Sequence, residues 1–453
     1  MIRALIKKVG YLFKRNPAGV VAADQPTIIP RSEHGVSRKE ISENALKVLY
    51  RLNRHGYQAY LVGGSVRDLL LGLHPKDFDV VTNAKPEEVR RVFRNCRLIG
   101  RRFRLAHVYF GPDIIEVATF RGMTEEPTDD ISHSEQGMIL RDNVYGTLVE
   151  DVWRRDFTIN ALYYNIADFS IVDYVGGFAD VKAKRMRMIG DVNQRYREDP
   201  VRILRAIRFA AKANFALGKD LTQPILELKE LLHHISSARL FEEVMKMFHS
   251  GVATRIYEEL KNHGLLAELF PITDESIHKN QYPTDALLCK VFESTDSRIR
   301  ADKSVTPSFI VTALLWYPIL ERTQVLMDKG LALLPARMQA VEELLNKQAK
   351  RVSIPKRITL GAREIWQFQL RLEKRHGKRA SLLFSEQRFR AAYDFLEMRS
   401  QIGESAHTQV LYEWWKAYVE GDADVRKDLV KNLAAPTGRK KSKRRKRKPA
   451  APA

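Results

Sequence analysis

Cysteine is nearly absent from the chain, which has only Cys96 and Cys289 in 453 residues. This scarcity excludes a disulfide-stapled scaffold and any zinc site built from several thiolates. The chain also lacks a long apolar run. Its longest uncharged stretch, residues 304–320, contains Thr312 and Pro318 and is shorter than a membrane-spanning helix requires. We therefore expect a cytoplasmic protein without a transmembrane helix.

Acidic residues are in deficit as well. The 55 Asp and Glu residues face 76 Lys and Arg residues, which leaves a formal net charge of +21. Nine of the ten residues 439–448 are basic, but the rest of the chain is also positively charged. Such a balance favours a polyanionic partner, with nucleic acid ahead of an anionic membrane surface. A hydrophobic content of 44% excludes a wholly disordered chain.

Glycine is unevenly distributed and divides the chain. Twelve of the 24 glycines lie between Gly56 and Gly190, and five lie between Gly330 and Gly421. Because glycine marks turns, the first region should contain strands and loops and the later region mostly helices. Short apolar runs predict strands at residues 60–62, 78–82, 107–110 and 114–118. Apolar residues at helical spacing predict helices at residues 41–52, 86–93 and 201–211. We expect an α+β head with a small mixed sheet, followed by an all-α region.

One constellation in the head points to phosphoryl chemistry. A predicted strand leads into Gly63-Gly64, Arg67 follows on a helix-like stretch, and Asp77 and Asp79 flank the start of the next strand. Strand alternation predicts that Asp77 and Asp79 share one face. Two neighbouring carboxylates suit Mg²⁺, which can hold nucleotide phosphates. A glycine turn before a helix lets backbone N–H groups approach a triphosphate, and Arg67 adds positive charge.

Four stretches occur in a fixed order between residues 61 and 212: LVGGSVRDLLLG, KDFDVVTNA, RRDFTINALYY and EDPVRILRAIRFAAK. Together they resemble the class II nucleotidyltransferases of the polymerase-β superfamily, which include tRNA CCA-adding enzymes and bacterial poly(A) polymerases. Residues 98–108, LIGRRFRLAHV, are similar to the signature of the bacterial poly(A) polymerase I group, whereas CCA-adding relatives carry a Phe-Gly-Thr type loop there. The chain has no His-Asp dipeptide, which argues against the phosphohydrolase domain of some relatives.

This resemblance implies a template-independent polymerase that adds AMP from ATP to RNA 3′ ends. It assigns Asp77 and Asp79 to a two-metal Mg²⁺ site and Asp156 to the third catalytic position. Glu116 competes with Asp156 for that position, and the sequence does not separate them. The residues that the resemblance assigns to nucleotide binding, including the base-reading set of the EDPVRILR motif, are Gly63, Gly64, Arg67, Arg155, Asp199, Arg202 and Arg205.

Basic residues outside these motifs are candidate RNA contacts. Arg101, Arg102 and Arg104 precede a predicted strand, and Lys356 and Arg357 open a basic helical region. Aromatic residues in that region would suit a single-stranded RNA track, although the apolar pattern around Trp366 favours a core position for that residue. The basic tail should add salt-sensitive affinity for RNA.

From these features we divide the chain into five parts. They are a flexible basic leader (1–37), a nucleotidyltransferase head (38–170), a neck for base recognition (171–250), a helical RNA-binding body (251–430) and a disordered basic tail (431–453). The expected partners are single-stranded RNA 3′ ends, RNA-decay factors and, through the leader, a weak peripheral membrane contact. Two other functions stay open: CCA addition to tRNA, and RNA binding by a non-catalytic protein on the same scaffold.

Overall fold

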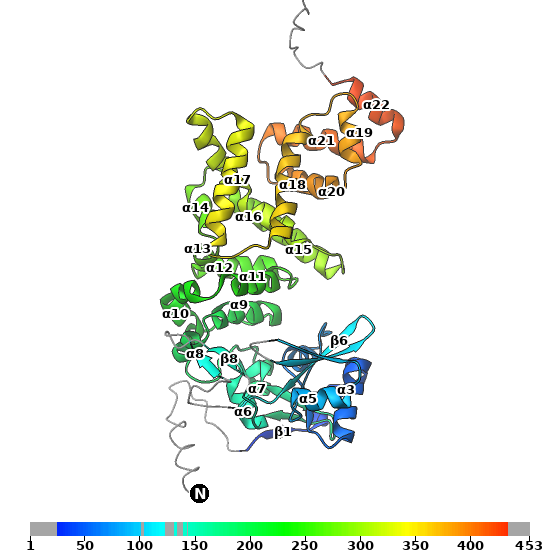
Figure 1. The fold of residues 1–453 in the computed structure, drawn as a ribbon, viewed down its shortest axis with the longest axis vertical. Coiled ribbons are helices and arrows are strands. Elements are labelled where there is room, and N and C mark those ends of the chain that lie inside the picture. The colour runs from blue at the N-terminus through cyan, green and yellow to red at the C-terminus, as the bar shows by residue number, and fades with distance from the viewer. Residues whose placement is uncertain (1–24, 101–103, 123–130, 134–138, 143, 434–453) are drawn as a thin grey trace, which may run out of the picture. The chain divides into compact units, whose positions relative to one another are not determined.

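The computed structural model describes residues 25–100, 104–122, 131–133, 139–142 and 144–433 (Figure 1). Arg101, Arg102, the first 24 residues and the tail from residue 434 lie outside the described residues. The chain forms two compact units. The first takes in the described residues up to Pro271, with Phe292–Ser304 and Lys347–Ser353, and the second takes in Ile272–Val291, Val305–Asn346 and the described residues from Ile354 onward.

An eight-stranded mixed sheet forms the centre of the first unit, in the order β1-β10-β9-β2-β3-β6-β5-β4. The pair β3–β6 is parallel and every other pair in this sheet is antiparallel. The strands are β1 Thr27–Ile29, β2 Ala59–Val62, β3 Asp79–Thr82, β4 Cys96–Ile99, β5 Leu105–Phe110, β6 Asp113–Thr119, β9 Leu162–Asn165 and β10 Ile171–Asp173. A separate hairpin joins β7 Ile131–His133 to β8 Ile139–Asp142. The α+β head with a mixed sheet is thereby confirmed.

The strands at one edge of this sheet, β1 and β10, lie outside the residues expected for the head domain. Thr27 of β1 pairs with Asp173 of β10, and Ile29 is buried. The sheet thus includes residues that the sequence assigned to the leader and to the neck. The assignment of residues 27–29 to a flexible leader is wrong, because the β1 backbone completes the hydrogen-bonding edge of β10. The remaining domain boundaries stay predictions.

Helices cover the sheet and extend the first unit beyond it. The expected helices at 41–52, 86–93 and 201–211 are confirmed as α3, α5 and α9. The helices are α2 Arg31–His34, η1 Arg38–Glu40, α3 Glu43–Arg54, α4 Gly64–Leu70, α5 Pro86–Val92, α6 Leu148–Arg154, η2 Thr158–Asn160, α7 Gly177–Lys182, α8 Val192–Glu198, α9 Val201–Ala213, α10 Lys219–Leu228, η3 Lys229–His234, α11 Ser237–Phe248, α12 Ala253–Asn262 and α13 Leu265–Leu269.

The core against the sheet explains why α6 and β9 lie where they do. Buried apolar side chains from β2, β3, α6, β9, β10 and the loops beside them form one cluster: Val62, Val81, Phe120, Val152, Ala161, Tyr163, Val172, Val175 and Ile189. Burial of this apolar surface stabilises the sheet at about 25 cal/mol per Å². It holds α6 close to the turn after β2, and the site described below lies in this region.

Two later stretches of chain return to the first unit. Asp296 accepts hydrogen bonds from the backbone N–H groups of Ala253 and Thr254, at 2.6 and 3.0 Å, and so satisfies donors at the start of α12. The side chain of Gln348 donates to the carbonyl oxygen of Leu269 at 2.8 Å. The division between units therefore falls within α15 and α17.

The second unit is helical throughout its described residues. Its helices are α14 Pro271–Lys279, α15 Thr284–Arg300, α16 Pro307–Asp328, α17 Leu333–Ala349, α18 Lys356–Leu372, α19 Arg379–Phe384, α20 Phe389–Gln401, α21 Ala406–Glu420 and α22 Ala423–Lys431. The apolar helix α16 is buried along most of its length. No described helix is long and apolar enough to cross a bilayer.

Candidate active site

The turn after β2 is shaped by a glycine. Gly63 has φ +79°, in the region that residues with a side chain rarely adopt. A Cβ atom at this position would lie 3.8 Å from Oδ2 of Asp79 and 3.9 Å from Nη1 of Arg155. Gly63 therefore lies between an acidic and a basic side chain. Gly64 opens α4 directly behind it, as the sequence predicted.

Acidic side chains gather at the start of β3. Strand β3 begins at Asp79, so Asp77 precedes the strand and does not alternate with Asp79 within it as expected. Both residues reach the solvent-facing surface, although the surrounding protein partly removes water from the Asp79 carboxylate. On the parallel neighbour β6, Glu116 stands one residue before Val117, which pairs with Val80. Partial burial, together with the Glu116 and Asp77 carboxylates, raises the pKa of Asp79 to about 6 against the opposing charge of Arg155.

These carboxylates have the chemistry of a divalent-cation site. Mutual repulsion disfavours the charged form of Asp79, and a cation between the groups would remove that penalty. Among the described residues, no group of three or more His, Cys, Asp or Glu side chains is placed so that it could hold a metal ion. Mg²⁺ is usually held by one or two carboxylates, with substrate phosphates and water as the other ligands, so the donor set fits.

Arg67 does not extend toward the turn as a free cation. Its guanidinium is 1% exposed and donates to Oδ1 of Asp68 at 2.9 and 2.6 Å and to Oδ1 of Asn160 at 2.8 Å. It also lies 5.5 Å from the ring centroid of Phe209 on α9. The structure thus places Arg67 beneath the glycine turn, where it links α4 to η2 and α9.

Arg155 is held in place by two neighbours. Its Nε donates to Oδ2 of Asp151 at 3.1 Å and to the hydroxyl of Tyr163 at 2.7 Å, and the Tyr163 hydroxyl donates to the same Asp151 oxygen at 2.7 Å. Burial alone would raise the pKa of Asp151, but Arg155 and Tyr163 lower it below its ordinary value. Sequence analysis missed Asp151, although its spacing of four residues from Arg155 is a helical signal.

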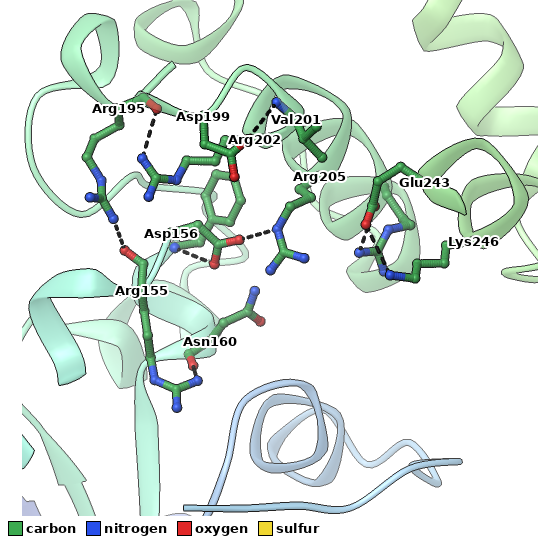
Figure 2. A network of polar contacts seen from close by, with 12 residues as sticks. Arg155, Asp156, Asn160, Arg195, Asp199, Val201, Arg202, Arg205, Glu243 and Lys246 are labelled. Atoms are coloured by element: carbon green, nitrogen blue, oxygen red, sulfur yellow. Dashed lines mark hydrogen bonds and ion pairs between the residues drawn. The ribbon is translucent and has the colours of Figure 1, made fainter. Parts of the chain in front are cut away.

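Asp156 belongs to a different network. Its Oδ2 accepts a hydrogen bond from Nε of Arg205 on α9 at 2.6 Å, and its Oδ1 accepts one from the backbone N–H of Phe157 at 2.9 Å (Figure 2). Burial would raise the pKa of Asp156, but Arg205, with Arg202, lowers it below the ordinary value. Asp156 therefore anchors α9, whereas Glu116, with Asp77, raises the pKa of Asp79.

The base-reading candidates have internal partners as well. Arg202 donates to Oε2 of Glu198 at 2.9 Å and to the carbonyl oxygen of Arg195 at 2.8 Å. Figure 2 shows Arg195 and Arg202 on one side of Asp156 and Arg205 on the other. Asp199 forms a two-point ion pair with Arg239 of α11, at 2.8 and 2.7 Å. Sequence analysis missed Arg239, because no local pattern connects positions 40 residues apart.

Comparison with known proteins decides the family. The chain is 49% identical over 437 residues to "Poly(A) polymerase I" of Salmonella typhi, covering 95% of this chain and 94% of that protein. It is 43% identical over 408 residues to "Poly(A) polymerase I" of Haemophilus influenzae, covering 89% and 90%. The chain belongs to the bacterial poly(A) polymerase I family. It is therefore a template-independent RNA nucleotidyltransferase.

Three family models match separate segments of the chain. Residues 59–187 match "Poly A polymerase head domain", residues 214–277 match "Probable RNA and SrmB- binding site of polymerase A", and residues 329–449 match "Polymerase A arginine-rich C-terminus". The first match contains the glycine turn, Asp77, Asp79 and Glu116. Arg239 lies in the second match. The poly(A) polymerase I resemblance expected from the sequence is confirmed.

CCA-adding enzymes are more distant. The "CCA-adding enzyme" of Lactobacillus johnsonii is 35% identical over 230 residues, which cover 51% of this chain and 56% of that protein. The crystal structure of the Bacillus stearothermophilus CCA-adding enzyme in complex with CTP is similar in fold, with a TM-score of 0.55 at 24% identity, and covers 87% of this chain and 88% of that chain. The two groups share a fold, but the near full-length match is to the poly(A) polymerase I family.

The candidate RNA contacts of this family member come from two distant parts of the chain. Arg104 is half-exposed and lies 3.0 Å from Glu87 of α5. Lys356 and Arg357 are exposed in the first turn of α18, in the second unit. Trp366 and Phe368, further along α18, are 1% and 3% exposed. The expected core position of Trp366 is confirmed. Because both aromatic rings are buried, neither of them can stack on RNA bases, and α18 offers RNA only its charged side chains.

Proposed function

We propose that Asp77, Asp79 and Glu116 form the catalytic carboxylate group at which AMP is transferred from ATP to an RNA 3′ end. The observation that supports this assignment is the raised pKa of Asp79, to about 6, caused by partial burial and by the adjacent acidic groups. Arg155 opposes this effect, but the pKa of Asp79 stays raised. Asp156 would then act in its hydrogen-bond network with Arg205 of α9 and not at the metal.

Mg²⁺ is the cofactor that this donor set would hold, and when bound it would supply activation of the 3′-oxygen and charge stabilisation of the leaving pyrophosphate. Oxygen atoms of Asp77 and Asp79 would be the protein ligands, with the Glu116 carboxylate beside them. The remaining ligand positions would fall to ATP phosphates and water, which is the usual division at a Mg²⁺ site of a nucleotide enzyme.

The glycine turn and Arg155 would bind the triphosphate. The absence of a Cβ at Gly63 keeps the space between Asp79 and Arg155 clear, and Gly64 begins a helix whose first N–H groups can face phosphate oxygens. Arg155 cannot turn away because Asp151 and Tyr163 fix its guanidinium. Arg67 would support this turn from below and not contact the nucleotide.

Adenine would be selected beside α9. Asp199 lies between α8 and α9, and Arg202 and Arg205 lie in the first two turns of α9. Their partners Arg239, Glu198 and Asp156 hold them in fixed orientations. A rigid arrangement of donors and acceptors can read the exchangeable edge of a base without a template strand. We propose that the fixed orientation, and not a movable pair of side chains, restricts the enzyme to ATP.

RNA would reach this centre through basic side chains outside it. Arg104, Lys356 and Arg357 are the described candidates, and Arg101, Arg102 and the basic tail would extend the same interaction. Phosphate contacts of this kind are independent of sequence and weaken with salt. RNA-decay factors are further partners that we propose for the segment 214–277, which matches the family model quoted above.

The test is extension of a labelled RNA by the purified full-length protein with Mg²⁺, supplied with one nucleotide at a time. We expect long tails with ATP, lost in Asp79→Ala and kept in Asp113→Asn, an exposed carboxylate on the same sheet. Unchanged incorporation by Asp79→Ala would overturn the assignment. Addition that is confined to a tRNA lacking its 3′ end and that stops after CCA would establish the alternative activity.

A further inference from the structure

A row of polar side chains crosses four strands of the sheet on one face. Val80 pairs with Val117, so Asp79 and Glu116 occupy the preceding positions of β3 and β6. Glu116 pairs directly with His107 of β5, and His107 pairs with Arg97 of β4. The row therefore runs Asp79, Glu116, His107, Arg97. The neighbouring row consists of Val80, Val117, Ala106 and Leu98, so the polar positions alternate with apolar ones.

The contact within this row that matters here joins His107 to Glu116. Nε2 of His107 lies 3.4 Å from Oε1 of Glu116. The imidazole is 16% exposed, whereas the Glu116 side chain is 50% exposed. A glutamate that is half in solvent can adopt several rotamers, and holding it in one costs up to about 2 kcal/mol of conformational entropy. The partly buried His107 ring on the adjacent strand limits those rotamers.

We propose that His107 is a positioning residue that holds Glu116 in one orientation, with Asp79 on the strand at its other side, and so orders the third carboxylate of the catalytic group. This inference rests on the proposed function, because it assumes that Glu116 acts at the cation. Nε2 of His107 faces Oε1 of Glu116 at ion-pair distance, and cross-strand register brings the two residues together. Partners of this type, one step removed from a metal, commonly change metal affinity or activity by about 10- to 100-fold when they are removed.

His107 itself is not expected to touch the nucleotide. Its other neighbours are the ring of Tyr109, with centroids 6.4 Å apart, and Arg97, whose guanidinium lies over Tyr109 at 5.5 Å. Tyr109 lies two residues further along β5 and faces the same way, but it pairs with Ile114 and not with Glu116. Tyr109→Leu is therefore a matched control for loss of a ring from this face of the strand.

The experiment compares His107→Leu, His107→Gln, Tyr109→Leu, Glu116→Gln and the double variant His107→Leu/Glu116→Gln in the full-length enzyme. Two quantities are measured: kcat and KM for ATP on a generic RNA, and Mn²⁺ affinity by electron paramagnetic resonance with a non-hydrolysable ATP analogue. We expect His107→Leu to lower kcat and weaken Mn²⁺ binding about tenfold, with KM for ATP unchanged. His107→Gln, which keeps an N–H donor, and Tyr109→Leu should stay within about threefold of the parent.

The double variant separates a positioning role from a general structural one. If His107 acts through Glu116, the double variant is no more impaired than Glu116→Gln alone. Additive losses, or equal losses in His107→Leu and Tyr109→Leu, would overturn the proposal. If His107→Leu behaves like the parent enzyme while Glu116→Gln is impaired, the proposal is also overturned, but the proposed function is left intact. Full activity of both Asp79→Ala and Glu116→Gln would instead remove the proposed function.

Discussion

Both carboxylate oxygens of Asp199 accept hydrogen bonds from the guanidinium of Arg239, at 2.8 and 2.7 Å. Asp199 precedes α9 and Arg239 lies in the first turn of α11, so this one pair ties the two helices together. Two-point pairs of this kind fix orientation as well as distance. The direction in which Asp199 presents its remaining lone pairs is therefore set by a residue 40 positions away.

We predict that Arg239→Ala relaxes nucleotide choice. Without its partner, the Asp199 side chain can rotate, so the ratio of kcat/KM for ATP to that for CTP should fall about tenfold, the order expected for one charge-assisted hydrogen bond. Arg239→Lys keeps the charge but not the two-point geometry and should recover only part of the ratio. An unchanged ratio in Arg239→Ala would show that Asp199 does not depend on this pair.

The pair Asp156–Arg205 predicts a pH-dependent contribution to stability. Because the pKa of Asp156 is lowered in the folded protein, its contribution is complete above the ordinary pKa of 3.8 and is lost as the pH falls through the lower folded value. We expect Asp156→Asn to reduce the free energy of unfolding by about 3 kcal/mol at pH 7. In urea titrations the gap to the parent should close below pH 3.8. A gap that persists unchanged in that range contradicts the assignment.

The glycine turn predicts unequal effects of two alanine substitutions. Gly63→Ala places a side chain at φ +79°, which costs about 1–2 kcal/mol and should deform the turn, so KM for ATP should rise about tenfold. Gly64 lacks a positive φ, and its added Cβ would meet Arg67 at an ordinary contact distance of 3.4 Å. Steady-state kinetics of Gly64→Ala should therefore match the parent within about threefold. Similar KM values for the two variants would argue against a conformational requirement at Gly63.

Substitutions on α18 should separate packing from RNA binding. Trp366 is 1% exposed, and its indole N–H donates to the carbonyl oxygen of Thr312 at 3.1 Å. We expect Trp366→Ala to reduce the free energy of unfolding by about 3–5 kcal/mol in chemical denaturation. The salt dependence of RNA affinity should not change, because the residue carries no charge. A stable variant with weakened RNA binding would place Trp366 at the RNA instead.

Lys356 and Arg357 should show the opposite behaviour. Both are exposed and charged in the first turn of α18, so the variant Lys356→Ala/Arg357→Ala should keep its thermal stability. RNA affinity should fall at low salt, and the slope of log K against log salt should decrease by up to about two. Equal affinity of parent and variant across a salt series would exclude these residues from the RNA track.

The sequence predicts the elements of the head well because local patterns determine them. Local pattern alone predicts a strand from the apolar run at residues 78–82 and a helix from the spacing at residues 201–211. Strand β3 and helix α9 form there. The position of Glu116 beside Asp79 depends on a parallel strand pair, which periodicity does not reveal. Sequence analysis therefore chose Asp156 for the third catalytic position with Glu116 as its competitor, whereas strand register places Glu116 beside Asp79.

The site residues that differ from expectation do so because of burial. Arg67 was expected to add charge at the triphosphate, but Asp68 and Asn160 take up its donors inside the fold. A buried guanidinium without such partners would be costly, so the inward orientation needs both of them. Neither the Asn160 contact nor the Arg239 pair follows from spacing, because each joins segments that are distant in sequence.

The discontinuous make-up of the catalytic unit has a consequence for its synthesis. Ala253 and Thr254 at the start of α12 receive their cap from Asp296, and Ser353 donates its backbone N–H to the carbonyl oxygen of Ser237 at 3.1 Å. On the ribosome, the glycine turn and all the carboxylates of the site emerge long before these closing contacts exist. The unit therefore completes folding only after residue 353 has emerged, and a gene fragment that ends at residue 271 would yield a catalytic centre on an unfinished scaffold.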